Sequence, residues 1–178
     1  MNKVLMKIKK KINGGRVTPE ELRERGGVVG KNCYIGTRNI DLAHAWLIKI
    51  GDNVTLSSCR LLVHDASTKR AIGYSKVGRI IIGNNVFVGA DALILPNVKI
   101  GNDCIIGAGA VVTSDVEDNS VVCGVPAKRI CSYDEYIEKN RVLFETAPHW
   151  DTHYSKKSDS EKRDMQQKLM NGGIGFDI

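Results

Sequence analysis

An aliphatic residue returns every six positions through the middle of the chain, between residues 82 and 112. A small or short apolar residue follows four positions after each one. A period of six fits neither the 3.6-residue turn of a helix nor the alternation of a simple strand. It indicates a short extended segment and a turn, repeated, so we expect an all-β fold, a parallel β-helix. The first set is Ile82, Val88, Ile94, Ile100, Ile106 and Val112, and the second is Val86, Ala92, Val98, Cys104, Ala110 and Val116.

Glycine directly follows four of the aliphatic residues, at Gly83, Gly89, Gly101 and Gly107. Glycine permits either a positive φ or the close passage of another backbone. Either property suits a tight turn between flat faces, which supports the β-helix.

The repeat is interrupted twice. Its phase is lost between residues 39 and 49, and again between Leu62 and Ile82, whose separation is not a multiple of six. We therefore expect residues 63–81 to leave the coil as a protruding loop. Loops of this length in compact repeats are uncommon and are usually functional.

Composition narrows the class of protein. The chain of 178 residues has a net charge of +6, which favours anionic partners. Only 6% of the residues are aromatic and none interleave with basic runs, so we do not expect nucleic acid as a partner. With no apolar run of bilayer length and no signal-peptide core, we expect a cytoplasmic protein. The five cysteines lack a CxxC pair, and we expect Cys33 and Cys104 to be reduced core residues.

Helical segments flank the repeat. Residues 3–12 carry apolar residues on one helical face among five lysines, which favours packing on the body or weak contact with a membrane surface. Thr18 and Pro19 predict the start of a second helix, ending by Arg25. A capping box at Ser132 predicts a helix that covers the last coil. We expect an N-terminal helical segment (1–27), a β-helix domain (28–131) and a C-terminal helix with a polar tail (132–178).

The hexads, the loop that opens at His64, and the closing Gly-Val-Pro-Ala-Lys at residues 124–128 resemble hexapeptide-repeat acyltransferases. The resemblance covers roughly residues 28–131. The most similar subgroup is that of maltose and galactoside O-acetyltransferases and the O-acetyltransferases of bacterial surface polysaccharides. The resemblance implies a left-handed β-helix, acetyl-CoA as acyl donor, and a sugar-type acceptor from polysaccharide biosynthesis.

The resemblance also implies the site residues. An acceptor hydroxyl needs a base within hydrogen-bond reach when it attacks the thioester, and histidine suits this work near neutral pH. His64 matches the family's catalytic histidine, which stands where the long loop leaves the coil. Asp65 follows it and either orients the imidazole, contacts substrate or is simply solvated. His44, beside Trp46, lines an acceptor pocket or belongs to a structural turn.

Cofactor residues follow from the same family pattern. Ala90, Ala108 and Thr113 match positions that line the groove for the pantetheine arm, although Ala90 replaces a serine of some members. Lys128 and Arg129 are the nearest basic pair for the cofactor's phosphates. In the family the active site lies between neighbouring β-helices, which implies a homotrimer.

Three alternatives remain. An N-acetyltransferase acting on an amino sugar would use the same base. A non-catalytic β-helix binding module has no use for a polar loop that opens on histidine. A zinc carbonic anhydrase on this fold needs three converging histidines. Its pair of histidines five positions apart is missing from the repeat, so we expect no metal.

Overall fold

The computed structural model describes residues 15–178. The helix expected over residues 3–12 therefore lies outside the described residues. The chain separates after Tyr133 into two compact units. The first is an all-β body, and the second, residues 134–178, is mainly helical.

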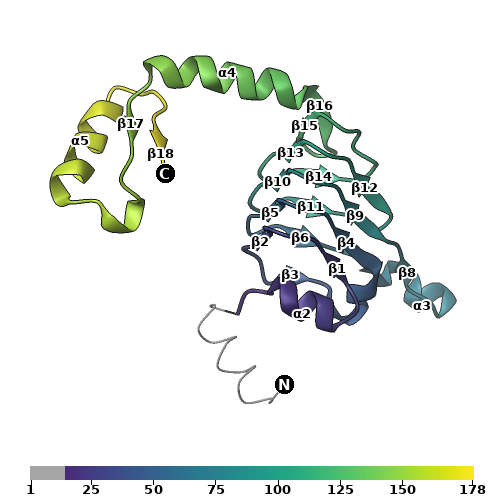
Figure 1. Ribbon diagram of the computed structural model, residues 1–178. Helices are drawn as coiled ribbons and strands as arrows, with labels where there is room; N and C mark the ends of the chain where they lie inside the picture. The colour runs from purple at the N-terminus through teal and green to yellow at the C-terminus, as the bar shows by residue number, and fades with distance from the viewer. Residues whose placement is uncertain (1–14) are drawn as a thin grey trace. The chain divides into compact units, whose positions relative to one another are not determined.

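The first unit is built from three stacks of short parallel strands (Figure 1). The chain contributes one strand to each stack in turn and then begins the next coil. Flat parallel sheets stacked in register are typical of a left-handed β-helix, so the expected fold class is confirmed. The first sheet contains β1 (Val28–Val29), β4 (Ile48–Ile50), β9 (Ile80–Ile82) and β12 (Val98–Ile100); the second contains β2 (Tyr34–Ile35), β5 (Thr55–Leu56), β10 (Val86–Val88), β13 (Cys104–Ile106), β15 (Ser120–Cys123) and β16 (Lys128–Cys131); the third contains β3 (Asn39–Ile40), β6 (Arg60–Leu61), β11 (Leu93–Ile94) and β14 (Val111–Val112).

The spacing between coils shows where the repeat is regular. The bond from Asn84 N to Asn102 Oδ1 joins coils that are 18 residues apart, which is three hexads per coil. The equivalent bond across the loop, from Asp52 N to Asn84 Oδ1, joins residues that are 32 positions apart. Near the end, the bond from Asn102 N to Asp118 Oδ1 joins residues that are 16 positions apart. The extra residues before β9 leave the coil as the protruding loop.

Both apolar columns predicted from the repeat are buried. The aliphatic residues from Ile82 to Val112 are at most 1% exposed, and the small residues from Val86 to Val116 at most 8%. Each inward residue lies on its counterpart in the next coil, so the apolar surface removed from water is shared along the stack rather than gathered in one centre.

Glycine stands at the turns because another backbone passes close by. A Cβ atom on Gly83 would lie 2.6 Å from Gly101 O, and one on Gly89 would lie 2.6 Å from Ala108 N. At the turns of the coils, positive φ angles fall mostly on asparagine and aspartate instead, for example Asn85 at 57°, and none falls on Gly83, Gly89, Gly101 or Gly107. Of the two roles expected for the repeat glycines, close passage is therefore the one observed.

The turn asparagines form a ladder along one edge of the β-helix. Asn32 Nδ2 donates to Asn53 Oδ1 at 3.1 Å, and Asn53 Nδ2 donates to Asn85 Oδ1 at 3.0 Å. Asn85 Nδ2 then donates to Asp103 Oδ1 at 2.9 Å. The ladder ties four coils together outside the apolar core.

The two ends of the β-helix are covered differently. Helix α2 (Pro19–Glu24) lies against the first coil, with Leu22 fully buried in the core. Thr18 Oγ1 accepts from Glu21 N at 3.1 Å, which confirms the expected start of this helix. At the other end β16 pairs antiparallel with β15, so the last parallel strand is not an open edge.

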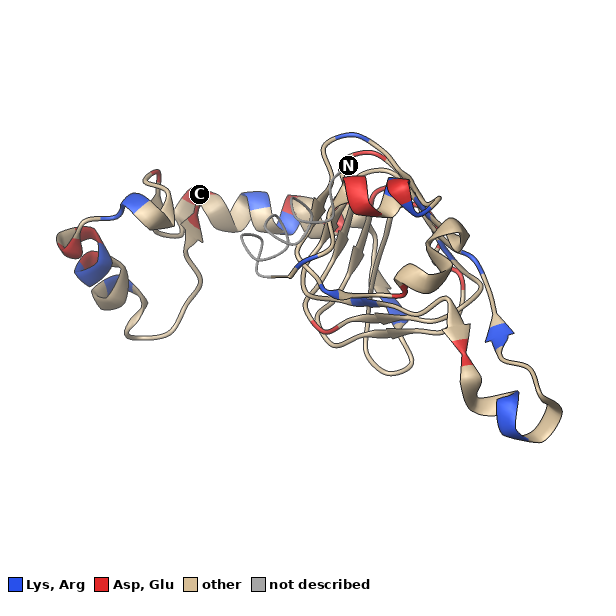
Figure 2. Cartoon of the chain, turned by 90° about the horizontal axis from the view of Figure 1, so that it is seen from below, with Lys and Arg blue, Asp and Glu red and all other residues tan. Residues whose placement is uncertain are grey.

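The loop between β6 and β9 begins as a short antiparallel ladder. β7 (His64–Asp65) pairs with β8 (Lys76–Val77), and η2 (Ala66–Thr68) and α3 (Lys69–Ile72) lie between them. Figure 1 shows α3 and β8 projecting from the side of the body. Figure 2 shows charged residues of both signs along this projection.

The second unit closes on itself through a short parallel pair. Trp150 is 9% exposed, and its Nε1 donates to Asp164 Oδ2 at 3.0 Å. Ser158 and Glu161 form a reciprocal capping box. The unit contains α4 (Tyr133–Thr146), which begins at the boundary, then β17 (His149–Trp150), η3 (Tyr154–Lys156), α5 (Asp159–Leu169) and β18 (Phe176–Asp177), which pairs with β17.

Residues 15–178 contain no helix that is long and apolar enough to cross a bilayer. The domain division at residues 27 and 131, and the covering of the last coil by the helix after Ser132, stay predictions.

Candidate active site

The candidate site lies where two neighbouring parallel strands end. β3 pairs with β6, and Ile40 is in register with Leu61. Asp41 directly follows β3, and His64 follows β6 by three residues, as the first residue of β7. Because the carboxyl ends of parallel strands meet at the same edge of a sheet, these two side chains come together although 23 positions separate them.

A hydrogen bond joins His64 Nδ1 to Asp41 Oδ2. The Asp41 side chain is 9% exposed and that of His64 is 37% exposed. With Nδ1 held by the carboxylate, Nε2 is the nitrogen of His64 that remains for chemistry. The antiparallel pairing of His64 with Val77 fixes the backbone from which the ring projects.

Asp41 is held as a carboxylate. Burial acts to raise its pKa, but the hydrogen bonds and charge interactions with His64, and then with His44, outweigh burial and lower the pKa below its usual value. Asp41 Oδ1 also accepts from Ala43 N at 3.1 Å, at the start of η1 (Leu42–Leu47). One side chain thus caps a helical turn with one oxygen and holds the histidines with the other.

His44 shares the same carboxylate. Its Nδ1 lies 3.2 Å from Asp41 Oδ2, and its ring centroid lies 5.0 Å from that of His64. The Trp46 ring centroid lies 5.4 Å from that of His44, and Trp46 is exposed. The structure therefore brings His44 and His64 together, with Trp46 beside His44.

Asp65 lies apart from this cluster. Its Oδ2 pairs with Lys76 Nζ at 2.8 Å, and its Oδ1 accepts from Ser67 N at 2.8 Å. The bond to Lys76, followed by those from Ser67, lowers the pKa of Asp65 to about 2. Asp41, not Asp65, is the carboxylate that contacts the His64 ring. The repeat did not point to Asp41, because the hexad phase is lost between residues 39 and 49; that interruption was the available signal.

The predicted cofactor residues lie on later coils of the β-helix than Asp41 and His64. Registers place Thr37, Ser58, Ala90 and Ala108 at the same turn of successive coils, two positions after the paired residues Ile35, Leu56, Val88 and Ile106. Ala90, Ala108 and Thr113 are all exposed, and Ala90 O accepts from Gly109 N at 2.8 Å. Small side chains here leave the backbone of this turn accessible.

Lys128 and Arg129 stand at the end of the β-helix that is farther from β3, on β16. Both are exposed, and Arg129 Nε donates to Ser120 Oγ at 3.3 Å. They offer positive charge at that end.

Asp41, His44 and His64 also form a possible metal-ligand set, with one ligand atom from each within 4.8 Å of the others. Two imidazoles and a carboxylate are a donor set that suits zinc. A metal bound by His64 Nδ1 would displace the hydrogen bond to Asp41, so that nitrogen cannot serve both roles.

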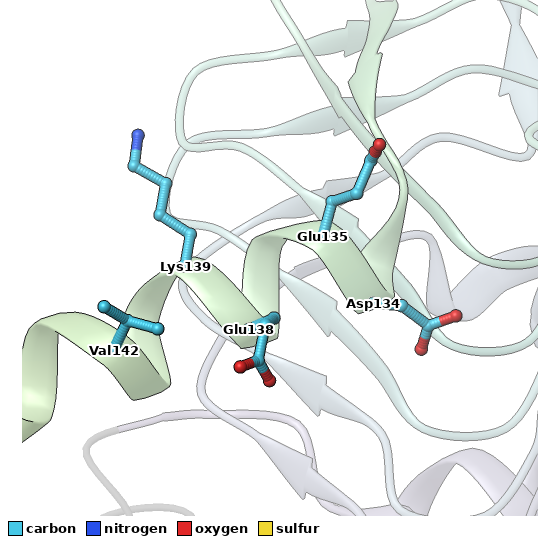
Figure 3. A pocket seen from close by; sticks show the side chains of 5 residues that line it. All are labelled: Asp134, Glu135, Glu138, Lys139 and Val142. Atoms are coloured by element: carbon cyan, nitrogen blue, oxygen red, sulfur yellow. The ribbon is translucent and has the colours of Figure 1, made fainter.

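A shallow hollow on α4 is lined by Asp134, Glu135, Glu138, Lys139 and Val142 (Figure 3). All five side chains come from one helix of the second unit. They include neither an imidazole nor a thiol, so this hollow is not a candidate for acyl transfer.

Comparisons with known proteins agree with the repeat. The family model described as bacterial transferase hexapeptide (six repeats) matches residues 79–114. Protein CapG of Staphylococcus aureus is 39% identical over 146 residues, covering 78% of this chain and 83% of its own length. Galactoside O-acetyltransferase of Escherichia coli (strain K12) is 39% identical over 108 residues, covering 57% of this chain and 52% of the enzyme, so the chain spans about half of that relative.

Solved structures show the same fold. A maltose O-acetyltransferase from Clostridium difficile 630 matches with a TM-score of 0.50 and 24% identity, over 74% of this chain and 89% of that one. A hexapeptide-repeat acetyltransferase from Vibrio cholerae O1 biovar eltor, complexed with acetyl coenzyme A, matches with a TM-score of 0.50 and 24% identity, over 63% and 74%.

Proposed function

Because this chain belongs to the hexapeptide-repeat acetyltransferase family, we propose that it transfers an acetyl group from acetyl-CoA to a hydroxyl of a sugar or surface-polysaccharide precursor. The observation that carries the proposal is the pair of Asp41 and His64 at the opening of the loop. An imidazole oriented by a carboxylate is well suited to activating a hydroxyl for attack on an acyl group.

In the proposed reaction His64 is the general base. Its Nε2 accepts the proton of the acceptor hydroxyl as the oxygen attacks the thioester carbon. Asp41 keeps the ring in the tautomer with the proton on Nδ1, and its negative charge stabilises the imidazolium that forms. When the tetrahedral intermediate collapses, the carbon–sulfur bond breaks and the imidazolium can return the proton to the leaving thiolate. The donors to the oxyanion, expected to be backbone N–H groups, stay a prediction.

The acyl donor is proposed to lie along the exposed turns at Ala90 and Ala108, near Thr113, with its phosphates at Lys128 and Arg129. The small, exposed side chains of Ala90 and Ala108 support this, since they leave room beside the turn for the extended pantetheine arm. The position of the basic pair at the end of the stack supports it as well. The acceptor would then approach His64, with His44 and Trp46 beside it. An exposed indole offers the kind of flat apolar surface on which a sugar ring can lie.

A homotrimer, with each site completed by a neighbouring β-helix, and a cytoplasmic location form part of the same proposal. Light scattering tests the assembly: a fully active monomer at micromolar concentration would contradict it. The expected weak membrane contact falls on residues 3–12, outside the described residues.

The deciding experiment measures acetyl transfer by parent and His64→Ala. We expect His64→Ala to fold and to lose about 10²–10⁴-fold in rate, the range for general acid–base catalysis. A variant within twofold of the parent would remove His64 from the mechanism. A panel of sugars and amino sugars, with products read by mass, separates O-acetylation from the alternative N-acetylation. Release of free thiol from acetyl-CoA separates either enzyme from a non-catalytic binding module.

A further inference from the structure

A second cluster of polar groups lies at the foot of the turn column that holds Ala90 and Ala108. It is a hollow of about 260 Å³. Every side chain that lines it is polar, and one residue contributes only backbone. The lining residues are Arg16, Gly36, Thr37, Arg38, Asn39 and Ser58.

Two arginines from different parts of the chain converge on this hollow. Val17 N donates to Thr37 O at 2.9 Å, which places Arg16 beside the turn that carries Arg38. The Arg38 side chain lies over the segment that carries Arg16: a Cβ atom on Gly15 would be 3.4 Å from Arg38 Nε. Arg16 Nη1 donates to Tyr34 Oη at 3.2 Å and is thereby held in place.

The charge of the two arginines is not paired with a carboxylate in the part of the chain that the structure describes. Within residues 15–178, neither Arg16 nor Arg38 takes part in an ion pair. Residues 1–14 contain no Asp or Glu that could supply one. Arg60 adds further charge, because it is in register with Asn39 on the adjacent strand and is also exposed. Like charges gathered without a counterion attract an anion.

The hydroxyl of Thr37 is already used, since its Oγ1 donates to Cys59 O at 2.5 Å and accepts from Asn39 N at 3.0 Å. It fixes the turn rather than serving a ligand. The groups left for a ligand are the two guanidiniums and the Asn39 amide, all of which can donate. Guanidinium donors match the oxygens of a phosphate in planar, paired hydrogen bonds.

The hollow is close to the proposed catalytic pair. Arg38 directly precedes β3 and Asp41 directly follows it. They are three positions apart, so their Cα atoms are separated by at most about 11 Å. The hollow stands at the opposite end of the stack from Lys128 and Arg129: β2 and β15 are four strand spacings apart, about 19 Å. An anion held at Arg38 is therefore near His64 and far from the proposed site of the cofactor's phosphates.

We propose that this hollow binds a phosphate or diphosphate group carried by the acceptor, so that the substrate is a phosphorylated or nucleotide-linked sugar rather than a neutral one. A single carboxylate is satisfied by one arginine, whereas two guanidiniums match the higher charge of a phosphate ester. This inference rests on the proposed transferase function, because only that function makes a ligand at the hollow an acceptor.

The first test is direct binding of inorganic pyrophosphate to the full chain by isothermal titration calorimetry. The starting protein carries Lys128→Gln and Arg129→Gln, which removes the other basic pair. We expect Arg38→Gln and Arg16→Gln each to weaken pyrophosphate binding by about tenfold or more, as for loss of a charge-assisted hydrogen bond. Arg70→Gln, an exposed arginine of α3 outside the lining, is the matched control and should change binding less than twofold. Equal binding by all four proteins, or none by the starting protein, overturns the proposal.

The second test compares a neutral hexose with its nucleotide diphosphate derivative as acceptors. Arg38→Gln should raise KM for the diphosphate acceptor and leave KM for acetyl-CoA unchanged. A rise in KM for acetyl-CoA instead would assign the hollow to the cofactor and overturn the proposal. His64→Ala separates the proposed catalytic function from the proposed anion site, because this variant should bind pyrophosphate like the parent. Full activity of His64→Ala would contradict the role of His64 as general base. The pyrophosphate titration would still test the anion site independently.

Discussion

Asp41 and His64 lie at the ends of adjacent parallel strands, and one hydrogen bond joins them across a gap of 23 positions in the sequence. The bond exists because β3 and β6 are parallel neighbours in one sheet and therefore end at the same edge. The stack of coils therefore positions the proposed catalytic pair, and His64 reaches Asp41 from the first residue of the loop's β7.

Asp41→Asn should fold and lose transfer activity. An asparagine of the same shape can present its amide N–H to Nδ1 and so favour the wrong tautomer of His64. We expect kcat to fall by at least about tenfold, up to the roughly 10⁴-fold seen when a triad aspartate is replaced in this way. Steady-state kinetics measure it, with His44→Gln as the control on the same carboxylate. His44→Gln should mainly raise KM for the acceptor, and a kcat loss equal to that of Asp41→Asn would show that the two histidines act as one unit.

Stability should depend on Asp41 at acid pH. Its pKa in the folded protein is lowered, burial being outweighed by the bonds from His64 and His44. A lowered carboxyl pKa stabilises the fold above the unfolded pKa of about 3.9, and the contribution is lost as pH falls through the folded value. Urea unfolding at pH 6 and pH 3 should show a larger loss for the parent than for Asp41→Asn. The same loss in both proteins would mean that this carboxylate is not stabilised by the histidines.

Lys128→Ala should raise KM for acetyl-CoA and leave kcat nearly intact, the behaviour of lost uniform binding. The rise should shrink as salt increases, because contacts with exposed phosphates are screened. Lys139→Ala, on α4, is the matched exposed control. A fall in kcat with unchanged KM would mean that Lys128 contacts something other than the cofactor.

The sequence predicted the coil well and the site only in part. The columns from Ile82 to Val112 and from Val86 to Val116 could be predicted because an uninterrupted period fixes which residues point inward. Asp41 could not be paired with His64 in the same way. The coils on which they lie are 21 residues apart, as in the bond from Lys31 N to Asp52 Oδ1, and not 18. Counting hexads therefore does not predict which residues of these two coils lie side by side.

The hollow between Arg16 and Arg38 could not be predicted from the sequence for a different reason. Arg16 precedes the repeat, and only the backbone bond from Val17 to Thr37 places it beside Arg38. No periodic pattern relates a residue outside the coil to one inside it. His44 could be suggested from its position next to Trp46, but its shared carboxylate required the structure.

Transfer activity should not require a metal, although Asp41, His44 and His64 could hold one. Dialysis against a chelator should leave the rate unchanged, and added zinc should inhibit because it competes for His64 Nδ1. Metal analysis of the purified protein accompanies the assay. Loss of activity on chelation, restored by zinc, would contradict the proposed base mechanism and favour a metal-dependent one.

The asparagine ladder should contribute measurably to stability, and Asn85 is the place to test it. Its side chain accepts from Asn53 and donates to Asp103, and its backbone has a φ of 57°. Asn85→Gly keeps the left-handed turn and removes both bonds. At a net of about 0.5–1.5 kcal/mol for each hydrogen bond, and less where water competes, we expect a loss of about 1 kcal/mol.

Asn85→Ala removes the same bonds but, unlike the glycine variant, keeps a Cβ in the left-handed region without the polar side chain that lets asparagine tolerate it. This costs roughly 1–2 kcal/mol relative to Asn85→Gly. Urea unfolding of parent, Asn85→Gly and Asn85→Ala should therefore give three separate midpoints in that order. If the glycine variant matches the parent, the ladder adds nothing beyond the turn conformation. If the alanine and glycine variants have the same midpoint, the turn has rearranged. Asparagine would then not be needed at this position for its positive φ.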